Sequence, residues 1–323
     1  MRTRLTELLG IEHPVMLAGM GGVSYHRLVA AVSEAGGFGC LGAGTMGTEE
    51  MVDEIRRVRA ATAKPFGVDL LTALPDQMAT NVEHLVAERV PVFVGALGVP
   101  REVIELCHEH NVLVVNMCGK VRHAVAAVEA GCDLVVAQGT EAGGHTGTVA
   151  TMPLVPQVVD AVGDRVPVVA AGGIFDGRGL AAALALGADG VWVGTRFIAT
   201  PEARAVPGYK DKLLATHEDG TVVSRAFSGK TMRVVRNETT RYYEEHPGEL
   251  RPFPEQIGIA FRAGSLHLPL GDDARDVDPD RECYPAGQGV GAVHDVVPAA
   301  ELVRRIVAEA EKALERMNVT LRS

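Results

Sequence analysis

A repeated pairing of a short apolar run with an amphipathic helical pattern is the feature that most restricts how this sequence folds. The two patterns alternate about every 25 residues, a spacing typical of strand–helix units in a parallel sheet. The apolar runs are continuous rather than alternating with polar residues, as expected for strands that are buried on both faces. Eight such runs occur before residue 200, and eight strand–helix units can close into a barrel.

The positions of these patterns define the expected elements. The strands are expected at residues 15–18, 38–41, 66–71, 92–97, 112–117, 134–138, 166–171 and 190–193. Helices are expected at residues 25–35, 49–61, 76–89, after Pro100, at 121–130, from near Thr151, at 179–186 and, last, at 299–317. The sequence therefore predicts an α/β fold, a (β/α)8 TIM barrel.

The regular rhythm stops after residue 200. Residues 201–283 contain several prolines and many charges but few apolar runs. A long irregular stretch inside a compact enzyme is more often an active-site lid than a linker. We therefore expect the barrel to comprise residues 1–200 and 284–323. The segment 201–283 is expected to be an inserted lid or substrate lobe before the last helix, covering the mouth of the barrel.

Composition argues against several classes of protein. The 323 residues carry a formal net charge of −10 and no basic run, which disfavours nucleic acid and anionic membranes as partners. No signal-peptide pattern and no apolar run of membrane-spanning length is present, so a cytoplasmic location is expected. The five cysteines form no CxxC pair and lie mostly among apolar residues, which favours reduced thiols over disulfides.

The segment AQGTEAGGHTG follows the sixth expected strand and precedes a helix. Gly143 and Gly144 let the backbone approach a ligand because they carry no side chain. Gln138, Glu141 and His145 add an amide, a carboxylate and an imidazole nearby. Glycines beside polar side chains indicate a binding site. Considered without the rest of the sequence, this loop would fit an ordinary solvent-exposed turn equally well.

Two further glycine loops, AAGGIFDGRG and WVGTRF, follow the seventh and eighth expected strands. In (β/α)8 barrels the active site lies at the carboxyl ends of the strands, and phosphate groups commonly bind between these two loops. The N–H groups that can meet one phosphate belong to Gly172, Gly173, Gly194 and Thr195, and the Thr195 hydroxyl adds a donor. Ordinary turn glycines are the alternative, which the occurrence of both loops in register disfavours.

These motifs carry a family resemblance. The sequence resembles the nitronate monooxygenases, formerly called 2-nitropropane dioxygenases, and the related flavin-dependent enoyl-acyl carrier protein reductases. The resemblance covers residues 8–197 and resumes at AGQGVGAV, and its carriers are PVMLAGMGG, PFGVDLL, AQGTEAGGHTG, VVAAGGIFDGRG and DGVWVGTRF. AQGTEAGGH, AAGGI and VGTRF in this order are specific for the superfamily and less specific within it.

The resemblance implies an FMN bound across the top of the barrel. The matching positions are Gly19, Met20, Asp69, Gln138, Gly143, Gly144, Gly172, Gly173, Trp192, Val193, Gly194 and Thr195. Gly19 and Met20 would line the isoalloxazine ring, and Gln138 would bond a flavin edge or a ribityl oxygen. Gly143 would lie against the cofactor, and the loops after strands seven and eight would hold its phosphate.

Two of these positions depart from the family pattern. Asp69 stands where the family usually has Asn, and an ionised carboxylate accepts hydrogen bonds but cannot donate one. Trp192 stands where a smaller or amide residue is usual. The first change puts an amide-like contact to the cofactor in question, and neither change removes the phosphate donors.

The implied reaction is the FMN-dependent oxidation of alkyl nitronates, and of nitroalkanes, by O2 to a carbonyl compound and nitrite. His145 falls where the family has its catalytic histidine. A neutral imidazole suits removal of the proton α to a nitro group, because its unperturbed pKa lies close to working pH. A substrate supplied as the nitronate would not need this base.

Two alternative activities stay open. An FMN- and NAD(P)H-dependent enoyl-thioester reductase has the same EAGGH loop and does not require a separate GxGxxG fold, which this chain lacks after its first strand. A barrel that isomerises or cleaves a sugar phosphate is disfavoured, because the strand ends carry almost no Lys or carboxylate base. The expected partners are a small-molecule substrate and O2, and a homodimer is open because apolar helix faces on barrels often pair.

The remaining candidates are weaker. No metal site is expected, because the chain has no HExxH motif and no tetrahedral ligand spacing. In SGKTMRVVRNE, which also looks like family sequence, Arg233 and Arg236 would meet an anionic substrate or the acidic rim of the barrel, the surface role being favoured. Four histidines in helical patterns are expected at the surface or in packing: His84, His108, His110 and His123.

Overall fold

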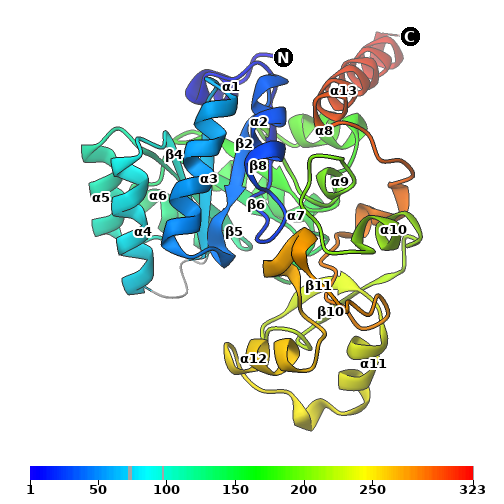
Figure 1. Cartoon of the computed structure of the whole chain (residues 1–323). Helices are drawn as coiled ribbons and strands as arrows, with labels where there is room; N and C mark the ends of the chain where they lie inside the picture. The colour runs from blue at the N-terminus through cyan, green and yellow to red at the C-terminus, as the bar shows by residue number, and fades with distance from the viewer. Residues whose placement is uncertain (72–74, 97, 323) are drawn as a thin grey trace.

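In the computed structural model, which describes residues 1–71, 75–96 and 98–322, eight parallel strands form a barrel surrounded by helices (Figure 1). The strands lie in the order β1-β9-β8-β6-β5-β4-β3-β2. A parallel bridge between Met16 and Phe38 connects β2 back to β1 and closes the sheet. The predicted (β/α)8 barrel is confirmed.

The strands lie where the apolar runs predict them. They are β1 (Val15–Leu17), β2 (Gly39–Gly42), β3 (Phe66–Leu71), β4 (Val92–Ala96), β5 (Leu113–Cys118), β6 (Leu134–Gln138), β8 (Val168–Ala171) and β9 (Gly190–Val193). The predicted end of the fourth strand, Leu97, lies outside the described residues.

The helices around the barrel also follow the predicted order. They are α1 (Arg4–Leu9), α2 (His26–Glu34), α3 (Thr48–Ala61), α4 (Pro75–Ala87), α5 (Arg101–Glu109), α6 (Val121–Ala130), α7 (Thr151–Val162), α8 (Gly177–Ala185), α9 (Thr195–Ile198) and α13 (Ala299–Arg322), with a 3-10 turn η1 (Ala43–Thr45). The last helix begins where predicted and continues past residue 317 to Arg322. No helix in the described part of the chain is both long and apolar enough to cross a membrane.

Side chains of the strands pack on two sides of the barrel wall. Met16, Val94 and Trp192 belong to the cluster inside the barrel, whereas Leu41 and Val135 belong to the larger cluster beneath the helices. Burying such a side chain completely stabilises the fold by about 1.5–3 kcal/mol each. Both faces are therefore apolar, which explains why the strand sequences show continuous apolar runs.

Helix α1, which the sequence patterns did not predict, closes the amino-terminal end of the barrel. Leu5 and Leu9 pack into the cluster inside the barrel. The helix begins with a capping box formed by Thr3 and Thr6, and it ends at Gly10, which has a φ of +66°. Because α1 covers this end, the carboxyl ends of the strands are where a ligand can enter.

The insertion contains its own small elements and core. These are α10 (Tyr209–Leu214), β10 (Thr221–Ser224), β11 (Met232–Val235), α11 (Glu238–Glu245), η2 (Pro247–Glu249), α12 (Glu255–Arg262) and η3 (Leu268–Asp273), followed by η4 (Gln288–Ala292). Phe227, Met232 and Val234 belong to a hydrophobic cluster separate from the barrel cores. Figure 1 shows α11 and α12 beside β10 and β11, on the side of the barrel away from α1.

The insertion joins the barrel through a second sheet. β10 and β11 are antiparallel, and β11 pairs in turn with the two-residue strand β7 (Gly144–His145) from the loop after β6. In this register Met232 lies opposite His145 and Arg233 lies opposite Gly144. The glycine loop after β6 is therefore held by the insertion.

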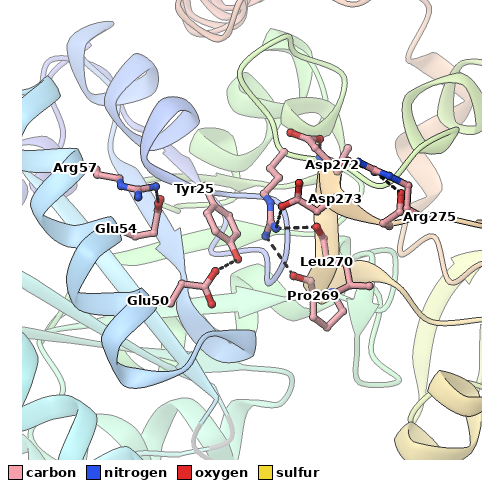
Figure 2. A network of polar contacts seen from close by, with 12 residues as sticks. Tyr25, Glu50, Glu54, Arg57, Pro269, Leu270, Asp272, Asp273 and Arg275 are labelled. Atoms are coloured by element: carbon pink, nitrogen blue, oxygen red, sulfur yellow. Dashed lines mark hydrogen bonds and ion pairs between the residues drawn. The ribbon is translucent and has the colours of Figure 1, made fainter.

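A second contact fastens the insertion next to α2 (Figure 2). The Arg204 guanidinium lies 4.3 Å from the centre of the Tyr25 ring and donates hydrogen bonds to the carbonyls of Pro269 and Leu270, at 3.3 and 2.7 Å. An ideal Cβ on Gly22 would lie only 2.0 Å from the Leu268 carbonyl oxygen. The segment around η3 thus lies directly on the loop that follows β1.

Candidate active site

A cavity of about 1110 Å³ opens at the carboxyl ends of the barrel strands and is lined by both the barrel and the insertion. Val193, the one cofactor position implied by the family resemblance that does not line it, is 1% exposed and packs in the cluster beneath the helices. The predicted residues that do line it are Gly19, Met20, Asp69, Gln138, Gly143, Gly144, His145, Gly172, Gly173, Trp192, Gly194 and Thr195.

The floor of the cavity is formed where inward-facing side chains reach the ends of the strands. Asp69 ends up beside Gly19, and an ideal Cβ on that glycine would lie 2.2 Å from the Asp69 Cβ. No donor in the described part of the chain contacts the Asp69 carboxyl group. Burial without a donor raises the pKa of Asp69 well above its usual range. The neutral acid, unlike a carboxylate, carries an O–H donor as well as an acceptor, as an Asn side chain does.

The loops after β8 and β9 form a cradle of backbone groups. Gly172 and Gly173 have φ values of +103° and +71°, a region that favours glycine. Their N–H groups donate to no acceptor in the described chain. The Thr195 hydroxyl accepts a 2.9 Å hydrogen bond from the N–H of Gly287, so its own proton remains available. Unpaired donors at the edge of the cavity fit the phosphate of a mononucleotide cofactor.

Gly143 lies where the backbone of residues 286–287, near the end of the insertion, approaches the loop after β6. An ideal Cβ at this position would lie 2.8 Å from the carbonyl carbon of Ala286 and 2.8 Å from the nitrogen of Gly287. Only glycine fits between these two segments without a shift of backbone. Gly143 therefore allows residues 286–287 to pack against this loop. Both glycines of EAGGH also line the cavity.

His145 is held from three directions. Its backbone pairs with Met232 in the second sheet, and its carbonyl accepts a 2.7 Å hydrogen bond from Nε2 of Gln138. Its ring nitrogen Nε2 lies 2.9 Å from Oγ of Ser228. His145 is exposed to the cavity, but the surrounding protein removes part of the hydration of its ring, and this desolvation, followed by the charge of Lys230, lowers the pKa of His145. The imidazole is therefore neutral at physiological pH and can accept a proton.

The charges that line the cavity contrast with the acidic chain as a whole. Although the net charge is −10, Asp69 is the one Asp or Glu among the described residues that line it. Permanent positive charges come from Lys120, Arg225 and Lys230. The Lys230 ammonium lies 4.3 Å from the centre of the Phe253 ring. This charge distribution favours an anionic ligand.

The sequence patterns missed the side chains that the insertion contributes. Ser228 and Lys230 lie 83 or more residues after His145, so no local spacing relates them to it. Within SGKTMRVVRNE, which resembles family sequence, the pattern predicts a role only for Arg233 and Arg236. Of its residues, Ser228 contacts His145 and Lys230 lines the cavity.

The other singled-out side chains stabilise the structure. Arg233 is buried and donates to the carbonyl of Thr140 at 2.9 Å, whereas Arg236 forms an exposed pair with Glu244. The Glu141 carboxylate accepts hydrogen bonds from the N–H and hydroxyl of Thr151, at 2.9 Å each, at the start of α7. The carboxylate predicted to lie beside the amide and imidazole thus turns away from them.

The remaining histidines and cysteines show no grouping typical of a metal centre. Within residues 1–71, 75–96 and 98–322, no three His, Cys, Asp or Glu side chains are placed to hold a metal ion. His108 pairs with Asp133, and His123 lines the cavity. The five cysteines are all buried and free.

Comparisons with known proteins agree with this architecture. A family model described as nitronate monooxygenase matches residues 2–84 and 74–309. The chain is 37% identical to a Mycobacterium tuberculosis protein named (3aS,4S,5R,7aS)-5-hydroxy-7a-methyl-1-oxo-octahydro-1H-indene-4-carboxyl-CoA dehydrogenase, over 96% of each chain.

Two solved structures are similar over nearly the whole chain. FabK from Thermotoga maritima is 35% identical, with a TM-score of 0.90 over 99% of each chain. A nitroalkane oxidase from Streptomyces ansochromogenes is 32% identical, with a TM-score of 0.84 over 98% of this chain and 100% of the other.

Proposed function

The chain belongs to the nitronate monooxygenase family and is an oxidoreductase, and on this premise we propose that it uses FMN to oxidise alkyl nitronates with O2. Neutral nitroalkanes would be substrates after loss of a proton to His145. The products would be a carbonyl compound and nitrite. The observation that carries the proposal is a neutral, fixed imidazole beside a glycine cradle with unpaired donors, in a cavity that favours anions.

The residues at the floor and cradle fit FMN. Gly172, Gly173 and the Thr195 hydroxyl would hold the phosphate, while Gly19 and Met20 would lie against the ring system. FMN, when bound, supplies an electron acceptor next to the substrate. Because neutral Asp69 offers an O–H and a carbonyl oxygen, it can replace the Asn that is usual in the family.

His145 would act on the substrate before oxidation. The C–H bond α to the nitro group breaks, its proton moves to the imidazole, and its electron pair delocalises onto the nitro oxygens. The positive charge of Lys230, on the same wall, stabilises the anion that forms. A preformed nitronate would bypass this step, so only neutral substrates would depend on the base.

A second candidate, the oxidation or NAD(P)H-dependent reduction of an acyl thioester, is favoured by one observation. Lys120, Arg225 and Lys230 line the cavity, and a phosphorylated carrier such as coenzyme A has several negative charges to pair with them. The M. tuberculosis relative is named as a dehydrogenase of a CoA thioester. The same His145 could remove the proton α to a thioester carbonyl.

Anaerobic mixing of the FMN-loaded protein separates the two candidates. The protein is mixed separately with propionate 3-nitronate, with NADH or NADPH, and with a saturated acyl-CoA, while the visible flavin absorbance is followed. Bleaching by the nitronate alone, with nitrite appearing after air is admitted, would support nitronate oxidation.

The other outcomes point elsewhere. Rapid bleaching by NADH or NADPH, without a response to nitronate, would favour a thioester reductase, and bleaching by the acyl-CoA would favour a thioester dehydrogenase. Failure to bind FMN at all would contradict the assignment of the loops after β6, β8 and β9.

A further inference from the structure

One side chain of the insertion touches the proposed base. Ser228 is 4% exposed and lies in the turn between β10 and β11. Its Oγ is 2.9 Å from Nε2 of His145. The remaining ring nitrogen, Nδ1, makes no hydrogen bond to the described part of the chain. The two nitrogens of the imidazole therefore have different surroundings.

The hydrogen bonds around Ser228 decide which nitrogen of His145 carries the proton. Ser228 Oγ lies 3.2 Å from the carbonyl oxygen of Lys230 and 3.3 Å from the backbone nitrogen of Lys230. The carbonyl can only accept and the N–H can only donate, while the hydroxyl has one proton to give.

Two arrangements are conceivable, and they differ in what remains unpaired. If the Ser228 hydroxyl donates to the Lys230 carbonyl, Oγ accepts both the Lys230 N–H and an N–H from His145 Nε2. If the hydroxyl instead donates to His145, the Lys230 carbonyl oxygen loses its hydrogen bond from Ser228. Because polar groups in protected sites are nearly always paired, the first arrangement is favoured.

We propose that Ser228 is a positioning residue that holds His145 in the tautomer protonated at Nε2, so that Nδ1 is the atom that takes the proton of the substrate. The inference rests on the proposed function for the role of His145 as a base. It adds a residue from the insertion to the proton-transfer step and names the accepting atom.

The step balances without another reactant. The C–H bond of the substrate breaks and an Nδ1–H bond forms, while the electron pair stays on the substrate as the nitronate or enolate. The imidazolium keeps its Nε2–H bond to Ser228, and Ser228 keeps its bond to the Lys230 carbonyl. The proton that Nδ1 takes up then returns to solvent, which regenerates the neutral imidazole before the next turnover.

A neutral partner has a consequence that a carboxylate partner would not have. The permanently charged groups lining the same cavity are Lys120, Arg225 and Lys230, and burial raises the pKa of Asp69, the acidic residue among the described lining. A carboxylate behind Nε2 would favour the imidazolium, whereas a hydroxyl orients the ring and leaves it uncharged. Ser228 therefore orients the imidazole ring without stabilising its doubly protonated, positively charged form.

The tautomer can be measured without any substrate. Two-bond ¹H–¹⁵N correlation NMR on ¹⁵N-histidine-labelled protein distinguishes a protonated nitrogen from an unprotonated one, and His145→Asn assigns the signals. We expect His145 of the native chain to be protonated at Nε2, with a proton that exchanges slowly with water. In Ser228→Ala this proton should exchange rapidly.

Two further variants keep the test specific. Ser228→Thr retains the hydroxyl and should restore the slow exchange. Ser224→Ala makes the same chemical change four positions earlier, at a hydroxyl that accepts from the N–H of Ala226, and should leave the His145 signals unchanged. A proton found on Nδ1, or a His145 signal that Ser228→Ala does not alter, would overturn the inference.

Turnover separates this inference from the proposed function. Ser228→Ala should slow the oxidation of neutral nitroalkanes on the order of tenfold, a part of the 10²–10⁴ that a general base contributes. Oxidation of preformed nitronates should be nearly unchanged, and equal losses on both would contradict a role in proton transfer. If the native enzyme oxidises neither substrate, the proposed function fails while the NMR result still tests the tautomer.

Discussion

The barrel and the insertion build the same cavity by different physical means. In the barrel, strands buried on both faces pair through backbone hydrogen bonds, and the cavity receives glycines and backbone donors such as those of Gly172 and Gly173. The insertion has only a small core and contributes side chains, Ser228 and Lys230 among them. The proposed cofactor cradle thus depends on backbone conformation, whereas the proposed proton chemistry depends on tertiary contacts.

His145 lies where the two regions meet. Its backbone belongs to a barrel loop, but it is paired with β11, and its ring contacts Ser228 of the insertion. A change in the barrel should therefore affect binding of the cofactor, and a change in the insertion should affect the use of the base. The following substitutions test this division.

Replacing the base should have the largest effect. His145→Asn should lower turnover of neutral nitroalkanes by about 10²–10⁴-fold, the range that a general base contributes, because no other group in this position can accept the proton. Preformed nitronates should lose far less. Steady-state rates on a nitroalkane and its nitronate check this, with flavin content as the control, and equal losses on both substrates would exclude the role.

A methyl group in the cradle should weaken the binding of FMN. An ideal Cβ on Gly172 would lie 2.8 Å from Thr151 Oγ1 and 3.0 Å from the Gly139 carbonyl, and φ there is +103°. Gly172→Ala should displace the N–H donors of this loop and so reduce the affinity for FMN by at least about tenfold. A tenfold change corresponds to about 1.4 kcal/mol of binding free energy. Fluorescence titration of the apoprotein measures this.

The matched control is Gly10→Ala, which has a φ of +66° and open space around the added methyl. It should cost stability through backbone strain of roughly 1–2 kcal/mol but leave affinity for FMN unchanged. If both variants bind FMN equally well, the loop after β8 does not hold the cofactor.

Removing the Arg204 contacts that connect the insertion to the start of α2, called the Arg204 clamp below, should have an intermediate effect on stability. Arg204→Ala removes the contact with the Tyr25 ring and the donors to Pro269 and Leu270. The expected loss is about 1–3 kcal/mol, measured by urea unfolding. Arg275→Ala is the control, because Arg275 is exposed and donates only within its own segment. Similar losses in both variants would argue against a clamp.

The smallest effect is expected at the floor, and it should depend on pH. Burial raises the pKa of Asp69, so the folded apoprotein holds this proton more tightly than the unfolded chain does. The folded protein loses no stability from this effect at a pH below the pKa that Asp69 has in the unfolded chain. The loss grows as the pH rises towards the higher pKa that Asp69 has in the folded protein. Asp69→Asn has no such loss and should therefore be more stable than the native chain, by more at pH 8 than at pH 5.

Thermal unfolding of the apoproteins tests the prediction for Asp69. A difference of 1 kcal/mol corresponds to roughly 2–4 °C in Tm for domains of about 150–250 residues, and to less for a longer chain such as this one. Asp164→Asn, a change at an exposed carboxylate, is the control and should change Tm equally little at both pH values. A gain for Asp69→Asn that is larger at pH 5 would contradict an uncompensated carboxylate at the floor.

Much of the barrel was predictable because its signals are local. Continuous apolar runs such as residues 134–138 and helical patterns such as 121–130 each reflect a few neighbouring residues, and the structure reproduces both. Helix α1 was missed because six residues with a charged start resemble a terminal coil until Leu5 and Leu9 are seen inside the barrel. The strands β7, β10 and β11 were missed because two- and four-residue strands carry little periodicity.

The candidate site divides in the same way. The glycine loops could be placed because a strand end, a glycine and a following helix are adjacent in the sequence. Glu141 was placed beside His145 for the same reason, but its carboxylate caps α7 because the loop turns between the two residues. The outward direction of Val193 follows from strand alternation, which a motif match does not consider.

The barrel, the glycine loops at its carboxyl end and the imidazole among them can be predicted from the chain alone, because each depends on residues that are close together in it. The side chains that surround that imidazole are brought to it by long-range folding. Ser228 reaches His145 across 83 residues through the pairing of β7 with β11, and the register of that pairing depends on packing in the insertion. Long-range pairing leaves no periodic pattern in the sequence, because its free energy comes from burial and hydrogen bonds that form only after the chain has folded.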